Sequence, residues 1–430
     1  MRVYLQALGC RLNEAELETW SQDWRQRGHA LCTSAEDADL VVINSCAVTA
    51  ESVRKSRQLV RRAQRGNPAA KLVVSGCYAS LDAADGGTGL AELGVDLVVP
   101  NTEKDRLVEI TCRELDLPVM PEAATEPAEQ TLFQRGRQRA FIKVQDGCRY
   151  RCTFCIVTRA RGEERSRPIG EIVDEINRHH AGGVNEVVLA GVHLGGYGSD
   201  RDTHLRELVQ AVLADTDVPR IRLGSLEPWE LHDDFWSLFD DNRLMPHLHL
   251  PIQSGADSVL RRMARRCRTD EFAALVDQAR AAIPAFNVTT DIIVGFPGET
   301  DAEWAETLAF AERMSFGHIH IFAYSARAGT KAAGLPDPVA RDTKRERSQQ
   351  LHAVARQSSR AVLEKAIGKI QPVLVEQRAE TDDATWLGYT PSYLRVEVAA
   401  TDGRDLSNRI VDVELRALNQ SGDRLTGLAR

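Results

Sequence analysis

The sequence lacks several features that would assign a protein to a broad class. None of its 430 residues belongs to an apolar run of the roughly 18 residues that a membrane-spanning helix needs. Its start is too short an apolar stretch for a secretory signal and contains no small-residue cleavage site. Positive charge is not in excess, because the net charge is −8. We therefore expect a cytoplasmic protein without membrane contacts, in which any nucleic-acid contact depends on local basic residues.

The nine cysteines are odd in number, which in a reducing compartment favours metal ligands and buried thiols over disulfides. Three of them, Cys148, Cys152 and Cys155, form a C-x3-C-x2-C run. Zinc ribbons generally pair one C-x2-C with a second knuckle, and neither a second knuckle nor His-x3-His follows here. A 4Fe-4S cluster usually takes four cysteines, so three would leave one iron open to another ligand. The run favours such a cluster over structural zinc.

A second group of three cysteines follows predicted strands near the start of the chain. Strand-like segments at 3–8, 40–44 and 71–75 alternate with helical periodicity, which predicts parallel βαβ units. Cys10, Cys46 and Cys77 each lie just past one of these strands, at the edge where open α/β sheets place ligands. They are about one βαβ repeat apart, so the fold can bring them together. The alternative is three buried structural thiols.

The rest of the chain predicts two further regions after a linker rich in proline, alanine and glutamate. Six strands separated by helical stretches are expected at 141–145, 186–190, 221–223, 247–250, 287–291 and 318–322. Six units are too few for an eight-fold barrel, so we expect an open, partial (β/α)6 barrel with the cysteine loop after its first strand.

A helical stretch at 341–368 leads to alternating strands from residue 370, with turn signals at Asp402-Gly403 and Ser421-Gly422. A tail of this size predicts a small β-barrel. The expected fold class is therefore α/β with an added small β-barrel. The expected domains and linker, in chain order, are 1–117, 118–135, 136–366 and 367–430.

Several longer motifs surround the cysteines and the expected strand ends. They are Leu8-Gly9-Cys10-Arg11-Leu12-Asn13, Asn44-Ser45-Cys46-Ala47-Val48-Thr49, Ser75-Gly76-Cys77-Tyr78-Ala79, Val144-Gln145-Asp146-Gly147-Cys148 through Ser166-Arg167-Pro168, His249-Leu250-Pro251-Ile252-Gln253-Ser254-Gly255, and Asp291-Ile292-Ile293-Val294-Gly295-Phe296-Pro297-Gly298-Glu299. In these motifs the chain resembles the methylthiotransferase family of radical S-adenosylmethionine enzymes over nearly its whole length.

The resemblance implies two 4Fe-4S clusters and S-adenosylmethionine as cofactors. Cys148, Cys152 and Cys155 would hold the cluster whose free iron is chelated by S-adenosylmethionine, and reductive cleavage there would give a deoxyadenosyl radical. Cys10, Cys46 and Cys77 would hold an auxiliary cluster that carries the inserted sulfur. The C-terminal barrel would resemble the RNA-contacting TRAM domain. An electron donor such as flavodoxin or ferredoxin is also implied.

Within the family, the sequences after the second and third strands and Arg159-Ala160-Arg161-Gly162 resemble the branch that acts on threonylcarbamoyladenosine beside the tRNA anticodon. The expected partner is therefore the tRNA anticodon stem-loop, and the expected product is the 2-methylthio nucleoside. The alternatives are methylthiolation of isopentenyladenosine in tRNA or of a ribosomal-protein aspartate. An alternative of another class is a non-catalytic iron–sulfur protein that binds RNA or carries sulfur.

Polar residues at the ends of the expected barrel strands are candidates for binding S-adenosylmethionine. They are Gly191, Ser225, Glu227, Gln253 and Asp291. His193, His247 and His249 could be ligands, although such histidines are more often hydrogen-bonded structural residues. Cys32, Cys112 and Cys267 have no motif partner and are expected to be ordinary thiols.

Three groups of basic residues could provide local contacts with RNA phosphates. Two of them, at 54–65 and 261–268, are equally compatible with solvated helix faces. The third surrounds the cysteine loop and is the best candidate; it comprises Arg149, Arg151, Arg159, Arg161, Arg165 and Arg167.

Overall fold

The computed structural model describes residues 1–117, 139–231, 233–379, 382–400 and 404–430, so the expected linker at 118–135 lies outside the described residues. The chain divides into two compact units that do not follow chain order. The first unit comprises Met1–Gln134, Gln145–Arg165 and Ser325–Ala333. The second comprises Arg135–Val144, Ser166–Tyr324 and Gly334–Arg430. The cysteine loop at 148–155 therefore belongs to the same unit as the N-terminal cysteines.

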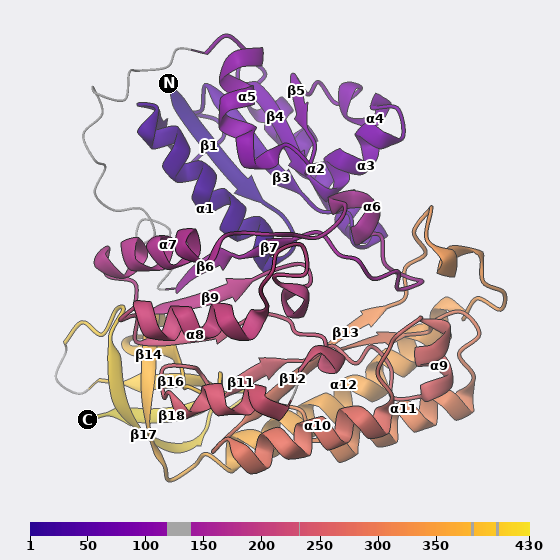
Figure 1. Cartoon of the computed structure of the whole chain (residues 1–430), viewed down its shortest axis with the longest axis vertical. Helices are drawn as coiled ribbons and strands as arrows, with labels where there is room; N and C mark the ends of the chain where they lie inside the picture. The colour runs from indigo at the N-terminus through magenta and orange to yellow at the C-terminus, as the bar shows by residue number, and fades with distance from the viewer. Residues whose placement is uncertain (118–138, 232, 380–381, 401–403) are drawn as a thin grey trace. The chain divides into compact units, whose positions relative to one another are not determined.

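The first unit is built on a parallel sheet with strand order β2-β1-β3-β4-β5 (Figure 1). Its strands are β1 (Arg2–Ala7), β2 (Ala30–Leu31), β3 (Leu40–Ser45), β4 (Lys71–Gly76) and β5 (Leu97–Val99). The sequence Leu-Val-Val-Ile-Asn-Ser of β3 is buried throughout, as expected of a parallel strand covered on both faces. The three strands predicted from the sequence are β1, β3 and β4, whereas β2 and β5 were not predicted.

Helices cover both faces of this sheet. The loop that carries Cys148, Cys152 and Cys155 packs into one of the two apolar cores through the residues that follow it. The helices are α1 (Arg11–Gln26), α2 (Ala50–Gly66), α3 (Cys77–Ala84), α4 (Thr88–Ala91), the short 3-10 helix η1 (Lys104–Arg106), α5 (Leu107–Glu114) and α6 (Val157–Arg161). One apolar cluster joins Val41 and Ile43 of β3 to Ile156 and Ala160, which flank or lie in α6. The other face buries Trp20 and Trp24 of α1.

The second unit contains six parallel strands in two sheets, ordered β10-β9-β6 and β11-β12-β13. They are β6 (Arg139–Lys143), β9 (Glu186–Ala190), β10 (Arg220–Leu223), β11 (His247–His249), β12 (Asn287–Val294) and β13 (His318–Ala323). Parallel bridges from Ile221 to Leu244 and from Ser225 to His249 connect the two sheets. The predicted partial (β/α)6 barrel is therefore confirmed.

Helices follow these strands, as the βα pattern predicts (Figure 1). They are α7 (Ile169–Ala181), α8 (Leu205–Asp215), α9 (Asp257–Arg262), α10 (Thr269–Ala282), α11 (Asp301–Met314) and α12 (Arg341–Glu364), with 3-10 turns η4 (Leu194–Gly196), η5 (Pro228–Glu230) and η6 (Asp233–Asp240). Strand β7 (Gln145–Asp146), which pairs with β8 (Arg165–Ser166), and the 3-10 turn η7 (Lys331–Gly334) lie in or at the edge of segments of the first unit. No helix in the described part of the chain is long and apolar enough to cross a membrane.

The chain ends in the predicted small β-barrel, which is closed in the order β14-β15-β16-β18-β17. Its strands are β14 (Ile370–Ala379), β15 (Asp382–Tyr389), β16 (Arg395–Ala399), β17 (Ile410–Leu418) and β18 (Leu425–Ala429). Leu363 and Ala366, at the end of α12, share its apolar core. Gly422 lies in the turn between β17 and β18, whereas the turn expected at Asp402-Gly403 lies outside the described residues.

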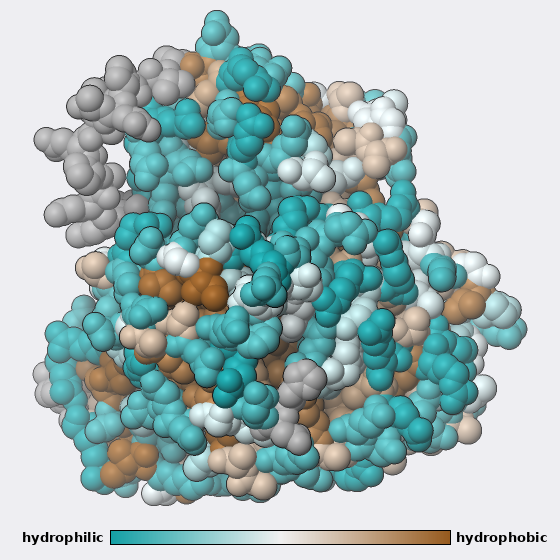
Figure 2. All heavy atoms as spheres, in the orientation of Figure 1, coloured by the Kyte–Doolittle hydropathy of each residue, from teal (hydrophilic) through white to brown (hydrophobic). Residues whose placement is uncertain are grey.

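A buried ionic seam joins the small barrel to the partial barrel. Glu186 of β9 pairs with Arg222 (2.8 Å), Arg220 (3.5 Å) and Arg139 (3.7 Å). The arginines also reach the small barrel: Arg222 donates to the Thr390 and Pro391 carbonyls, Arg220 donates to the Tyr389 and Pro372 carbonyls, and Arg139 pairs with Glu376 at 2.6 Å. Outside such contacts the visible surface is mainly hydrophilic (Figure 2).

Candidate functional site

The N-terminal cysteines lie at one edge of the first unit's sheet. Cys10 directly precedes α1, Cys46 follows β3, and Cys77 is the first residue of α3 after β4. The three strands end level with one another, because Asn44 of β3 is aligned with Ala7 of β1 and with Ser75 of β4. The three cysteines therefore lie at the same edge of the parallel sheet, as expected from the sequence.

Contacts at this edge show how closely the three cysteines approach. A Cβ atom placed on Gly9 would lie 2.8 Å from both Cβ and Sγ of Cys46, so the turn carrying Cys10 rests on Cys46. Cys10 is accessible to solvent. Its dense surroundings nevertheless raise the pKa of its thiol; the positive charge of Arg161 opposes this rise, and negative charge on Cys77 adds to it. Cys10 and Cys77 are therefore close enough for their charges to interact.

Serine side chains hold the backbone around Cys46. The Ser56 hydroxyl accepts from the Cys46 N–H at 3.0 Å and donates to the Cys46 carbonyl at 2.9 Å. The Ser45 hydroxyl accepts from the Ala79 N–H at 3.1 Å, which ties the end of β3 to the helix that carries Cys77. The cysteine positions are thus fixed by hydrogen bonds that need no bound group.

The loop that carries Cys148, Cys152 and Cys155 is held closed by backbone and side-chain hydrogen bonds. The Cys148 N–H donates to the Gly162 carbonyl at 3.1 Å, and the Cys155 N–H donates to the Cys152 carbonyl at 3.0 Å. The Thr158 hydroxyl of α6 donates to the Tyr150 carbonyl at 3.0 Å. The segment Ser325–Ala333 also supports the loop, because the Ala332 N–H donates to the Thr153 carbonyl at 2.8 Å.

The donor chemistry of this loop fits a metal cluster. Burial, together with negative charge on Cys155 and Cys152, raises the pKa of Cys148 to about 12. Three neighbouring thiolates would repel one another, and a bound iron–sulfur group relieves that repulsion because its ligands are deprotonated. The role of the three cysteines as ligands of such a group stays a prediction.

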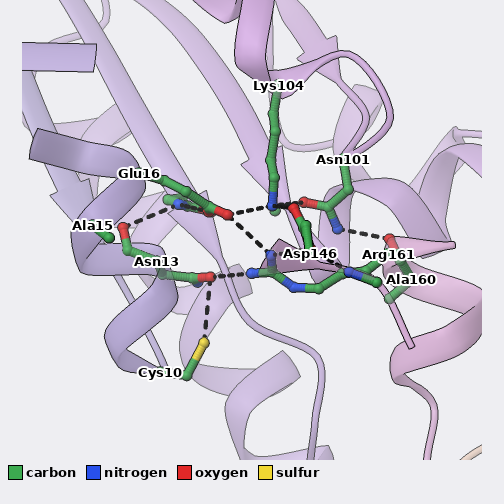
Figure 3. Close-up of polar contacts among 12 residues, drawn as sticks. Cys10, Asn13, Ala15, Glu16, Asn101, Lys104, Asp146, Ala160 and Arg161 are labelled. Carbon is green, nitrogen blue, oxygen red and sulfur yellow. Dashed lines mark hydrogen bonds and ion pairs between the residues drawn. The ribbon is translucent and has the colours of Figure 1, made fainter. Parts of the chain in front are cut away.

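A network of buried charges lies between Cys10 and α6 (Figure 3). Arg161 is 2% exposed and donates to Glu16 Oε1 at 2.9 Å and to Asp146 Oδ1 at 3.0 Å. Lys104, which is 0% exposed, pairs with Glu16 and with Asp146 Oδ2, the latter at 3.0 Å. Although burial opposes its charge, Glu16, Cys77 and Asp146 hold the pKa of Arg161 well above its ordinary value. Two cations therefore face two carboxylates.

Two asparagines connect this network to the cysteine segments. Asn13 Oδ1 accepts from Arg161 Nη2 at 2.7 Å and from the Cys10 thiol at 3.7 Å. Asn101 Oδ1 accepts from Lys104 Nζ at 3.2 Å, and Asn101 Nδ2 donates to the Ala160 carbonyl at 2.7 Å. Sequence reasoning missed Asn13, Asn101, Glu16, Lys104 and Asp146 as members of the site. Asn13 and Asp146 lie inside the cysteine motifs, whereas nothing in the local sequence of the other three distinguishes them from solvated residues.

The prediction that Arg161 contacts RNA phosphates is wrong, because its guanidinium is buried and bound by two carboxylates. Arg159 is different: its side chain is 42% exposed and it bonds to Asp85 and to the Ala328 carbonyl. Arg149 and Arg151, both exposed, pair with Glu164 and Glu163, and the half-buried Arg167 pairs with Glu175. RNA contact by these arginines stays a prediction.

The candidates for binding S-adenosylmethionine lie at strand ends of the second unit. Gly191 follows β9, and Ser225 forms a parallel bridge to His249. Glu227 pairs with Arg265 through both carboxylate oxygens, at 3.2 and 2.7 Å. Backbone bonds join Gln253, which has a φ of 76°, to the neighbouring strand β12, where the Asp291 carboxylate lies 3.1 Å from His249 Nε2. Their role as cofactor ligands stays a prediction.

The remaining histidines have polar partners within the second unit. His247 is buried and hydrogen-bonded to the Thr289 hydroxyl at 3.1 Å, and His193 pairs with Glu230 at 2.6 Å. Cys32, Cys112 and Cys267 are free thiols. Burial raises the pKa of Cys267 to about 12, so it is an inert thiol at neutral pH.

Comparison with known proteins first defines the class. Residues 142–311 match the radical SAM superfamily, and residues 2–99 match the uncharacterized protein family UPF0004. The fold is similar to that of the radical S-adenosylmethionine methyltransferase TsrM from Kitasatospora setae, with a TM-score of 0.57, 15% identity and 77% of each chain covered. The partial barrel and its three-cysteine loop thus define a radical S-adenosylmethionine enzyme.

Closer relatives give the family. The chain is 35% identical to the threonylcarbamoyladenosine tRNA methylthiotransferase MtaB of Bacillus subtilis (strain 168), over 96% of this chain and 93% of the relative. It is 32% identical to the tRNA-2-methylthio-N(6)-dimethylallyladenosine synthase of Methylacidiphilum infernorum (isolate V4), over 90% of this chain and 87% of the relative. The chain belongs to the tRNA methylthiotransferase family of radical S-adenosylmethionine enzymes, which implies S-adenosylmethionine and a 4Fe-4S cluster as cofactors.

Proposed function

We propose that this enzyme converts threonylcarbamoyladenosine next to the tRNA anticodon to its 2-methylthio derivative. The observation that carries the proposal is the presence, in one compact unit, of two separate groups of three cysteines. Two such groups suit a reaction that needs both a radical source and a sulfur donor close to one carbon atom. The substrate assignment is supported by two relatives at 35% identity that are named for threonylcarbamoyladenosine, whereas relatives named for the dimethylallyl product reach 34%.

The chain's own residues would divide the work between two sites. Cys148, Cys152 and Cys155 would hold one 4Fe-4S cluster, which when bound supplies the electron that cleaves S-adenosylmethionine. The N-terminal trio, Cys10, Cys46 and Cys77, would hold a second cluster and the sulfur. The polar strand ends Gly191, Ser225, Glu227, Gln253 and Asp291 would orient S-adenosylmethionine. Flavodoxin or ferredoxin is the proposed electron donor, and the cytoplasm, where tRNA is modified, is the proposed location.

A second candidate substrate is dimethylallyladenosine, also called isopentenyladenosine, because a relative at 32% identity is named for that reaction. The two substrates differ in the group on N6 of the adenine and share the carbon that would be modified. Mass spectrometry of tRNA nucleosides from a deletion strain without a paralogue separates them. We expect the 2-methylthio form of threonylcarbamoyladenosine to disappear; its persistence, with loss of the dimethylallyl product, would move the assignment to the second candidate.

The two cysteine groups are tested by two triple alanine variants after anaerobic reconstitution. Replacing Cys148, Cys152 and Cys155 should remove about half of the bound iron and abolish deoxyadenosine formation under strong reduction. Replacing the N-terminal trio should also remove about half of the iron, yet leave deoxyadenosine formation intact and abolish methylthio transfer. Unchanged iron in either variant would contradict the assignment of its ligands. Methylthiolated product from the N-terminal variant would show that the sulfur is carried elsewhere.

A further inference from the structure

The buried network around Arg161 contains more charge than the stability of the fold requires. Glu16, Lys104, Asp146 and Arg161 are each at most 3% exposed in their side chains. Removing four charges from water is costly, and buried ion pairs are often no more stabilising than apolar residues of similar size. A network of this kind is better explained by what it positions than by the stability it adds.

The network connects the two cysteine segments through side-chain bonds (Figure 3). On one side, Asn13 accepts from both Cys10 and Arg161. On the other side, Arg161 donates to Asp146, and the Asp146 carboxylate accepts from the Gly147 N–H at 2.8 Å, one residue before Cys148. A path of contacts therefore runs from Cys10 to the start of the Cys148 loop through a single guanidinium.

The two cations of the network are not equivalent. Arg161 reaches Asn13, the hydrogen-bond partner of Cys10, and its charge acts on both Cys10 and Cys77. Lys104 instead pairs with the same two carboxylates and reaches α6 through Asn101. A planar guanidinium presents its donors in a rigid fork, whereas an ammonium group is a compact charge with three rotatable donors. This difference allows the role of Arg161 to be separated experimentally from the role of the network as a whole.

We infer that Arg161 is a positioning residue that fixes the Cys10 turn against the Cys148 loop and makes the metal group held by Cys10, Cys46 and Cys77 easier to reduce. Reduction adds negative charge to such a group, and a fixed cation nearby stabilises the reduced form, since net charge and hydrogen bonding tune the potentials of iron–sulfur clusters. The inference rests on the proposed function, because that function provides the second cluster.

The test uses the full chain with Cys148, Cys152 and Cys155 replaced by alanine, so that only the N-terminal site can hold a cluster. Into this background we would introduce Glu16→Gln with Arg161→Gln and, as a matched control, Glu16→Gln with Lys104→Gln. Each pair removes one buried cation and one buried carboxylate, so the network stays neutral in both. The midpoint potential of the cluster is then measured by redox titration followed by electron paramagnetic resonance.

We expect a more negative midpoint potential in the pair that lacks Arg161 than in the pair that lacks Lys104. Equal potentials in the two pairs would overturn the inference while leaving the second cluster in place. Absence of iron from the parent background would instead overturn the proposed second cluster, and the inference with it. If the Arg161 pair does not fold, Asp146→Asn with Arg161→Gln is compared with Asp146→Asn with Lys104→Gln, for which the same order of potentials is expected.

Discussion

Replacing Gly147 by alanine is expected to remove iron from the Cys148 loop without unfolding the protein. Gly147 has a φ of 74°, and a Cβ atom on it would lie 1.9 Å from the Glu163 carbonyl oxygen. The left-handed conformation alone costs a residue with a Cβ atom about 1–2 kcal/mol. Relief of the clash by a backbone shift adds about 1–3 kcal/mol, by analogy with overpacked cores.

The total of about 2–5 kcal/mol corresponds to roughly a 30- to 4,000-fold change in the equilibrium between the ordered loop and an opened one. This cost falls on the residue directly before Cys148, whose N–H is bonded to the Gly162 carbonyl. Most of the strain should therefore be released by opening the cysteine loop and not by unfolding the N-terminal sheet. We expect iron content after reconstitution to fall toward half, together with loss of deoxyadenosine formation.

The matched control is Gly170→Ala in α7, where an added Cβ atom meets nothing within 4 Å. In a helix this change should be neutral or stabilising by at most about 1 kcal/mol. Iron content and thermal unfolding of both variants are measured side by side with the parent protein. Full iron content in Gly147→Ala, with a melting temperature equal to that of Gly170→Ala, would refute the reasoning that the loop depends on a glycine at this position.

Three further predictions concern charges. Hydrogen bonds from Arg262, Ser258 and the Thr300 N–H together lower the pKa of Glu303 from 4.5 to about 2. The unfolding free energy lost in Glu303→Gln should therefore be constant above about pH 5 and shrink as the pH falls toward 2, because a depressed carboxyl pKa stabilises only while the group is ionised; a pH-independent difference in urea unfolding would contradict this. Glu186→Gln leaves buried Arg220 and Arg222 and the largely buried Arg139 without their shared carboxylate and should lower stability by about 3–5 kcal/mol; a loss of only a few tenths of a kcal/mol in calorimetry would contradict this. Arg159→Ala should weaken tRNA binding and reduce its salt slope by about 0.7–0.9, whereas Arg106→Ala, at a residue paired with Glu109, should leave the slope unchanged.

The parallel sheet could be predicted because its strands are continuous apolar runs. The predicted bounds of β3 and β4 differ from those in the structure by one residue at most. β2 and β5 contain only two and three residues, too few to show a period, so they were missed. The position of Cys10, Cys46 and Cys77 after three of these strands could also be predicted. The ends of parallel strands meet at one edge of a sheet whatever the details of packing.

The buried network could not be predicted, because its members are far apart in sequence and chemically ordinary. Arg161 and Glu16 are separated by 145 positions, and both lie on helices that also carry solvent-exposed charges, such as Arg159 and Arg11. The sequence therefore suggested an RNA contact for Arg161, in a group of six arginines around a reactive loop. Only the packing of α6 into the N-terminal core, through Ile156 and Ala160, turns this one arginine inward.

The ionic seam between the two barrels has a practical consequence for dissecting RNA recognition. A chain truncated after α12 would lose Glu376 and the carbonyl groups that bind Arg220 and Arg222, leaving three guanidinium groups around Glu186. The exposed charges would be expected to destabilise the partial barrel itself. If such a truncated chain no longer modified tRNA, damage to the partial barrel would explain the loss. The result would therefore not show that the small barrel binds RNA. Point substitutions on the exposed side of the small barrel, such as Arg416→Ala, are the informative alternative.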